Sequence, residues 1–272
     1  MKNLLFKKST FALSLGLGLL ATQSCQKETT NSIKSLSAAE ATAQVGIADQ
    51  LFYEMYQVQS NLVSRSGEDE NGAMITINED ASPKQLTADY GAGVVGADGK
   101  TRSGKVTINY VSDGLYTIGN KIDASFENFR INDNITSGKI AIHNVGFDVN
   151  KHVAFKVVLS ATQNMPDGKV SIKSTNKVSI IEGFDTPRVF DDVLQIEGST
   201  YGVLTSDEKF ETSFPTPLVR KRSNECVKHY VSGVTLTKIE NQPDRYVDYG
   251  NGSCDNLATE TVDGVSKTIS LD

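Results

Sequence analysis

Cys25 is the residue whose surroundings most clearly suggest a covalent modification. It follows an apolar run at residues 11–21 and precedes a polar stretch at residues 26–35. A thiol in this position can be a structural group, a reactive nucleophile, or a point where the chain is cut and modified. The residues on either side of Cys25 favour the third interpretation.

The first 24 residues have the pattern of a targeting segment. Lysine occupies three of the first eight positions, and the apolar run at residues 11–21 has 11 residues. A membrane-spanning helix needs about 20 apolar residues, so this run is too short to cross a bilayer. Its length fits the apolar region of a signal peptide. The small residue Ser24 stands directly before Cys25.

This arrangement resembles the signal of bacterial lipoproteins. In that class a signal peptidase cuts before the cysteine, and acyl chains are attached to the sulfur and to the new amino group. The resemblance implies a signal peptide at residues 1–24, cleavage between Ser24 and Cys25, and lipidation of Cys25. Two or three acyl chains anchor a protein firmly, because each buried CH₂ contributes about 0.8 kcal/mol. The alternative is a secreted protein with a free thiol at Cys25.

The residues after Cys25 carry a further resemblance. Gln26, Lys27 and Glu28 resemble the Lys-acidic signal that sends lipoproteins of the Bacteroidota to the outer face of the outer membrane. The resemblance implies a lipid-anchored outer-membrane protein displayed on the cell surface. Residues 25–35 are polar and poor in core-forming side chains, so they are expected to form a flexible tether.

Residues 36–66 are predicted to form one N-terminal amphipathic helix that covers a sheet. Ser37 and Glu40 have the spacing of a capping box. Apolar side chains recur with a period near 3.6, at Ala48, Leu51, Phe52, Met55, Val58 and Leu62. The polar surface is expected to include Glu54, Gln57 and Gln59. A membrane-surface role is disfavoured, because this polar face lacks Lys and Arg.

Residues 67–272 are predicted to form an antiparallel β domain. Apolar and polar residues alternate there, and Asp-Gly turns separate the alternating segments. The expected fold is mainly β, either an antiparallel β-sandwich or one large curled antiparallel sheet. Residues 74–110 and 234–271 share an order of strand, proline, Asp-Tyr-Gly-x-Gly, Asp-Gly and strand. We interpret these two segments as a duplicated hairpin unit.

The lipoprotein signal and the Asp-Tyr-Gly-x-Gly β domain together resemble uncharacterised outer-membrane or surface lipoproteins of the Bacteroidota. The resemblance covers most of the mature chain. It implies the β fold and the location, and it implies no activity.

Cys226 and Cys254 are predicted to form a disulfide. They remain as an even pair in an oxidising compartment once Cys25 is lipidated. Cys226 precedes a predicted strand and Cys254 follows the strand that returns to it, so pairing of these strands brings the thiols together. The closed loop of about 28 residues would contribute on the order of 3 kcal/mol. Free buried thiols and a metal site are the alternatives, and His229 is the only histidine close to them in sequence.

No sequence motif specifies a catalytic residue. The three histidines lack His-Glu-x-x-His spacing, and neither a Gly-x-Ser-x-Gly elbow nor a P-loop is present. Asp191 and Asp192 could form the carboxylate pair of a glycoside hydrolase. The alternative for these two residues is a loop before the next strand. We predict no catalytic residues, which favours a protein that is not an enzyme.

Calcium is the only cofactor that the sequence suggests, and no other metal is expected. Asp248, Asn251 and Asp255 cluster in a Gly-rich turn, and hard oxygen ligands suit Ca²⁺. Asp and Asn also favour turns for conformational reasons alone.

A basic stretch, Arg220-Lys221-Arg222, raises the question of an anionic ligand. It could bind an acidic glycan or a lipopolysaccharide phosphate, or it could protect a solvated strand edge. Nucleic acid is not an expected partner, because the formal net charge is −6.

These features predict a lipid-anchored cell-envelope protein with a non-enzymatic binding or structural role at the outer membrane. The expected partners are the membrane, through the lipid, and a glycan or an envelope protein. The alternative is a cell-surface hydrolase acting on polysaccharide or peptide. Two carboxylates about 5–9 Å apart would favour the hydrolase. A groove lined by Tyr110, Tyr116 and Phe126 would favour glycan binding.

Overall fold

The computed structural model divides the chain into two units, Met1–Ser35 and Leu36–Asp272. The description that follows concerns the second unit. Ser24, Cys25, Gln26, Lys27 and Glu28 lie outside the described residues, as do both ends of the predicted helix. The described residues are 47–48, 50–59, 67, 71–96, 99–111, 115–165, 168–186, 191–222, 226 and 229–271.

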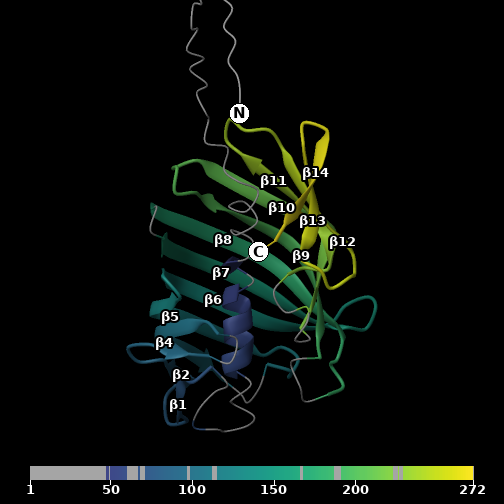
Figure 1. The fold of residues 1–272 in the computed structure, drawn as a ribbon. Helices are drawn as coiled ribbons and strands as arrows, with labels where there is room; N and C mark the ends of the chain where they lie inside the picture. Colours follow the sequence, from purple (N-terminus) through teal and green to yellow (C-terminus); the bar gives the residue numbers. More distant parts are fainter. Residues whose placement is uncertain are drawn as a thin grey trace, which may run out of the picture. The chain divides into compact units, whose positions relative to one another are not determined.

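Fourteen strands in the described residues form a single antiparallel sheet that is not closed (Figure 1). The mainly β prediction is therefore confirmed, and of the two expected arrangements the single large sheet is correct. The strands follow one another in chain order across the sheet, except that β3 pairs only with β4. They are β1 (Met74–Asn78), β2 (Lys84–Asp89), β3 (Val94–Val95), β4 (Thr101–Tyr110), β5 (Lys121–Ile131), β6 (Asn134–Phe147), β7 (Val153–Met165), β8 (Gly168–Glu182), β9 (Val193–Val203), β10 (Lys209–Lys221), β11 (Ser232–Ile239), β12 (Arg245–Asn251), β13 (Leu257–Val262) and β14 (Val265–Ser270).

Local turn chemistry explains why consecutive strands pair. In the β13–β14 hairpin, Val262 pairs with Val265, and both intervening residues, Asp263 and Gly264, have positive φ. That backbone is the type I′ turn, which Asp-Gly favours and which matches the twist of antiparallel strands. Because the strands alternate in direction, the connections after β4, β6, β8, β10 and β12 all lie at one end of the sheet. We call this end the loop end.

The helix at residues 47–48 and 50–59 packs inside the curve of the sheet (Figure 1). Its apolar residues Leu51, Met55 and Val58 are buried in one core with side chains from both halves of the sheet. The expectation of a polar outer surface on this helix is wrong for its described part: Glu54, Gln57 and Gln59 are also buried. Glu54 contacts Arg102 on β4, so this polar position of the helix also meets the sheet.

Close contact between neighbouring backbones accompanies the curvature of the sheet. Gly233 lies at a bulge between β10 and β11 and has a φ of +105°. A Cβ atom there would lie 2.4 Å from the carbonyl oxygen of Pro217 and 2.7 Å from Cα of Leu218. Bulges and glycines are the usual means of bending a sheet, so glycine is required here for both conformation and space.

The two segments of the proposed duplication lie at opposite ends of the strand order, in β1–β4 and in β11–β14. They share one local hydrogen bond. Oδ1 of Asp89 accepts from the backbone N–H of Gly91, and Oδ1 of Asp248 accepts from that of Gly250, both at 2.8 Å. This shared turn fits the duplication, which stays a prediction.

Cys226 and Cys254 form the predicted disulfide, with their Cα atoms 5.1 Å apart. The bond joins the chain after β10 to the β12–β13 turn, so it fixes two loop-end segments to each other.

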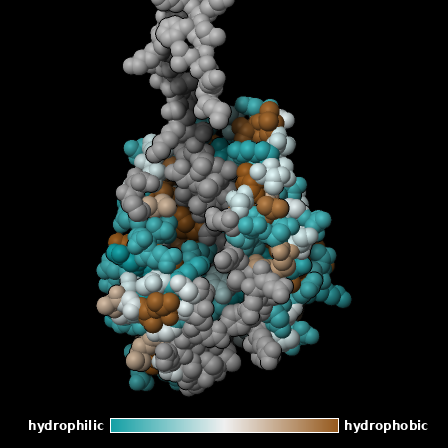
Figure 2. All heavy atoms as spheres, in the orientation of Figure 1, coloured by the Kyte–Doolittle hydropathy of each residue, from teal (hydrophilic) through white to brown (hydrophobic). Residues whose placement is uncertain are grey.

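Figure 2 shows one face of the molecule, on which hydrophilic residues predominate and hydrophobic ones form separate patches. Among the described residues, no helix has the length and apolar character needed to cross a membrane.

The bulge at Gly233 provides a test of the fold. Gly233→Ala should lower the free energy of unfolding by about 1–3 kcal/mol, because it forces a side chain into a positive-φ position against the β10 backbone. The neighbouring Ser232→Ala adds no atoms and should change it by less than about 0.5 kcal/mol. Urea unfolding followed by circular dichroism measures both, and equal midpoints for the two variants would contradict the assignment.

Candidate functional site

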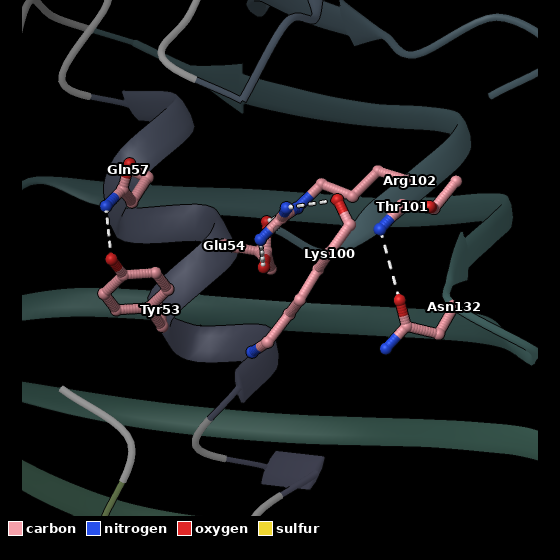
Figure 3. A network of polar contacts seen from close by, with 7 residues as sticks. All are labelled: Tyr53, Glu54, Gln57, Lys100, Thr101, Arg102 and Asn132. Carbon is pink, nitrogen blue, oxygen red and sulfur yellow. Dashed lines mark hydrogen bonds and ion pairs between the residues drawn. The ribbon is translucent and has the colours of Figure 1, made fainter. Parts of the chain in front are cut away.

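The helix is held against β4 by a buried ion pair between Glu54 and Arg102 (Figure 3). Nε of Arg102 donates to Oε2 of Glu54 at 2.9 Å, and Nη2 donates to Oε1 at 2.7 Å. Nη1 also donates to the carbonyl oxygen of Lys100 at 3.4 Å. Two parallel hydrogen bonds between a guanidinium and a carboxylate form only at one relative orientation and separation of the two groups. They therefore fix the rotation of the helix about its axis.

Two further hydrogen bonds lie around this pair (Figure 3). Nε2 of Gln57 donates to the hydroxyl oxygen of Tyr53 at 2.6 Å, one helical turn away. The backbone N–H of Thr101 donates to Oδ1 of Asn132 at 3.1 Å, which ties the start of β4 to the β5–β6 turn. The helix therefore presents Tyr53 and Tyr56 to the sheet in fixed positions.

Five side chains meet where this helix faces the loop end: Tyr53, Tyr56, Tyr116, Asp192 and Arg222. We call them the tyrosine–arginine cluster. The hydroxyl of Tyr56 donates to Oδ2 of Asp192 at 3.0 Å and is also hydrogen-bonded to the hydroxyl of Tyr116. Because Tyr56 gives its single proton to Asp192, Tyr116 must be the donor in the second bond.

Arg222 is the member of the cluster whose charge is buried without a hydrogen-bond partner among the described residues. Its guanidinium carbon lies 4.3 Å from the ring centroid of Tyr53 and 5.0 Å from that of Tyr56. The residue is 1% exposed, and its three guanidinium nitrogens have no hydrogen-bond partner among the described residues. Cation–π contact contributes about 2 kcal/mol when desolvated, whereas burial of an uncompensated charge costs several kcal/mol. The site therefore favours an anion.

Burial also controls the protonation of Asp192, Tyr56 and Tyr116. It raises the pKa of Asp192 to about 6, with a smaller contribution from the charge of Asp191, while Tyr56 and Arg222 act in the opposite direction. Burial raises the pKa of both Tyr56 and Tyr116, so both stay protonated at neutral pH. Asp192 is thus the group in the cluster that changes charge near neutrality.

The basic stretch Arg220-Lys221-Arg222 does not protect a strand edge, because β10 lies between β9 and β11. Arg220 packs near Tyr230, with its guanidinium carbon 6.0 Å from the ring centroid, and burial lowers the pKa of Arg220. Nζ of Lys221 instead donates to the carbonyl oxygen of Gly252 at 3.0 Å. Two of the three cations thus lie in the interior.

An aromatic pair at the surface adjoins the cluster. The rings of Tyr116, from the β4–β5 connection, and Phe184, from the β8–β9 connection, have centroids 5.7 Å apart. Tyr116 is 38% exposed and Phe184 43%. We call these two residues the aromatic rim. Tyr116 belongs to both groups, so it connects the loop-end surface with the buried side chains.

The structure separates most of the other residues that the sequence suggested for chemistry. The exposed carboxylate of Asp191 accepts a hydrogen bond from the hydroxyl of Thr186, whereas that of Asp192 is bonded to Tyr56. The two adjacent carboxylates therefore occupy different environments. Tyr110 and Phe126 are buried in the core, so they line no groove with Tyr116.

The calcium candidates Asp248, Asn251 and Asp255 do come together, around an open depression of about 500 Å³ beside the β12–β13 turn. Oδ1 of Asp248 and Oδ1 of Asp255 each accept a backbone N–H two residues further on. Within the described parts of the chain, no three His, Cys, Asp or Glu side chains are grouped to hold a metal ion. Calcium therefore stays a prediction, and the observed bonds are those of turns.

Comparison with protein-family models, curated proteins and solved structures found no match for this chain.

Sequence reasoning missed the tyrosine–arginine cluster, although one signal for it was present. Arg220 and Arg222 are in phase with the fully buried Leu218 on β10, so alternation places all three on the inner face. No comparable signal links Tyr56 to Asp192, because 136 residues separate them.

The Glu54–Arg102 pair predicts a specific pattern of stability. Arg102→Met leaves a carboxylate buried without its cation and should lower the free energy of unfolding by about 3–5 kcal/mol. The double variant Glu54→Leu, Arg102→Met removes both charges and should recover most of this loss. Urea unfolding of the two variants and the parent measures the difference. A double variant no more stable than the single one would show that the pair is not the anchor.

Asp192 predicts a pH dependence of stability. A carboxyl whose pKa is raised on folding binds its proton more tightly in the native state, so stability falls as pH rises between the usual value near 4 and about 6. At about 1.4 kcal/mol per pKa unit, and because solvent screening reduces the effect, this loss amounts to at most about 3 kcal/mol. Asp192→Asn should flatten the dependence, whereas Asp191→Asn should retain it. Urea unfolding at pH 4, 5, 6 and 7 checks this, and an unchanged slope in Asp192→Asn would refute it.

Proposed function

We propose that the chain is a lipid-anchored protein of the outer membrane that binds a carbohydrate at its loop end. One observation carries the binding role: two exposed aromatic rings, Tyr116 and Phe184, lie together at the loop end. The apolar face of a sugar packs on such rings, and aromatic side chains supply large contact areas at low entropic cost.

The rim has the rigidity that recognition requires. The ring of Tyr116 also contacts that of Phe155, with centroids 6.5 Å apart, and its hydroxyl is bonded to Tyr56. Tyr56 lies on the helix that the Glu54–Arg102 pair fixes. A ring held in this way loses little freedom when a ligand binds, which favours affinity.

A binding role is favoured over hydrolysis by the surroundings of the aspartate pair. Asp191 is bonded to a surface hydroxyl and Asp192 to a buried phenol. A glycoside hydrolase needs two carboxyl groups that face the same bond from opposite sides.

The location is proposed on the sequence around Cys25. Metabolic labelling with palmitate should mark the parent protein and leave Cys25→Ala unlabelled. Protease treatment of intact cells should digest the parent protein if it is displayed at the surface. Equal label in both proteins would overturn the lipid anchor, and full protection from the protease would overturn the display.

Carbohydrate binding predicts which substitutions matter. Phe184→Leu and Tyr116→Leu keep an apolar side chain but remove the ring, and each should weaken binding about tenfold, or about 1.4 kcal/mol. Tyr201→Leu, at an equally exposed tyrosine on β9, is the matched control and should bind as the parent does. A panel of neutral and acidic oligosaccharides measures affinity. Absence of binding by the parent protein to every member would overturn the proposal.

A further inference from the structure

Beneath the aromatic rim, Arg222 has donors that no described side chain uses. A guanidinium group carries five N–H donors in one plane, and a cation–π contact with an aromatic ring does not give any of them a conventional hydrogen-bond acceptor. The rings of Tyr53 and Tyr56 lie within cation–π distance, while Nε, Nη1 and Nη2 have no hydrogen-bond partner in the described residues. The contacts that Arg222 makes therefore leave its N–H donors buried and unpaired within the described residues.

Asp192 lies close to Arg222 but does not neutralise it by direct contact. The backbone N–H of Arg222 donates to the carbonyl oxygen of Asp192 at 3.1 Å, so the two residues are neighbours on paired segments. The side chain of Asp192 is bonded to Tyr56, and the described residues show no ion pair between Asp192 and Arg222. Arg220, two residues earlier on the same strand face, adds positive charge to this region.

We infer that the bound carbohydrate carries a carboxylate that pairs with the in-plane donors of Arg222. This inference rests on the proposed function, since it assigns a chemical class to the ligand of the aromatic rim. A carboxylate is planar and accepts two parallel hydrogen bonds from a guanidinium edge. Its single negative charge matches the charge of Arg222, which no described residue neutralises by direct contact. Uronic acids combine such a carboxylate with a ring that can stack on Tyr116 and Phe184.

Tyr116 links the surface on which the sugar ring would stack to the cluster that contains Arg222. Its ring forms part of the exposed rim, and its hydroxyl reaches the hydrogen bond between Tyr56 and Asp192. A sugar on the rim thus lies against a side chain that is hydrogen-bonded into the same cluster as Arg222.

The same geometry couples carboxylate binding to a proton on Asp192. The charged and titratable groups that face Asp192 are Tyr56 from the helix, Tyr116 from the β4–β5 connection, Arg222 from the end of β10, and the adjacent Asp191. A second carboxylate brought to Arg222 repels ionised Asp192, so binding favours its protonated form. Affinity for the acidic sugar should therefore fall as pH rises above about 6, by at most tenfold per pH unit.

Matched pairs of oligosaccharides test the assignment. The probes are trimers of glucose and glucuronate, galactose and galacturonate, and mannose and mannuronate, each pair differing in a hydroxymethyl or carboxylate group. Titration calorimetry with the purified protein should show at least tenfold tighter binding of one acidic trimer than of its neutral partner. Arg222→Gln should abolish this preference, whereas Lys221→Gln, the adjacent cation, should retain it. Urea unfolding of Arg222→Gln verifies that the variant is folded.

The outcomes separate this inference from the proposed function. Equal affinity for neutral and acidic trimers, or a preference that survives Arg222→Gln, overturns the carboxylate assignment and leaves carbohydrate binding standing. Inorganic phosphate that competes better than acetate also overturns it. If neither the trimers nor the wider panel bind, both the carboxylate assignment and carbohydrate binding are overturned.

A second measurement tests the proton coupling. The affinity for the acidic trimer should depend on pH in the parent protein, and this dependence should be flattened in Asp192→Asn. An unchanged dependence overturns the proton coupling.

Discussion

The helix inside the sheet is surrounded by apolar side chains, and apolar contact alone has no direction. Leu51, Met55 and Val58 would be almost as well buried if the helix rotated or slid by a fraction of a turn. The pair between Glu54 and Arg102 removes that freedom, because both hydrogen bonds form only in one orientation. Tyr53 and Tyr56 flank Glu54 on the helix, so their positions at the loop end depend on an interaction made with β4.

The curl of the sheet has a similar long-range effect. An open sheet of this size cannot fill its own concave face, and the helix supplies the missing core. The same curl brings β4, β9 and β10 close to one helix, although the sheet order separates β4 from β10 by five strands. The disulfide between Cys226 and Cys254 fixes the chain just beyond Arg222 to the β12–β13 turn. Arg222 is therefore positioned by a strand on one side and a covalent bond on the other.

Alternation and turn chemistry are local, which is why the antiparallel strands and the disulfide could be predicted from the sequence. A sandwich and a single curled sheet contain the same hairpins, so only contacts between distant strands distinguish them. A helix that packs on a flat sheet keeps one face in solvent, and Glu54 was predicted to lie on that face. The curl of the sheet removes this assumption. Arg220 and Arg222 show their inner phase in the sequence, but their burial depends on β9 and β11 lying on both sides of β10. Tyr56 and Asp192 meet only through the complete fold.

Arg102 and Arg222, the two fully buried arginines of the described residues, illustrate different solutions to the same physical problem. Arg102 has a carboxylate with matching geometry, so its charge is compensated within the chain. Arg222 has two aromatic rings within cation–π distance and a carboxyl group nearby, but that carboxyl is hydrogen-bonded to Tyr56 and its ionisation is opposed by burial. A purely structural role would be better served by an apolar side chain at this position, since replacing buried charges with apolar groups is often stabilising. The unpaired charge of Arg222 therefore supports the proposal that a ligand compensates it, with the aromatic rim as the surface that holds this ligand.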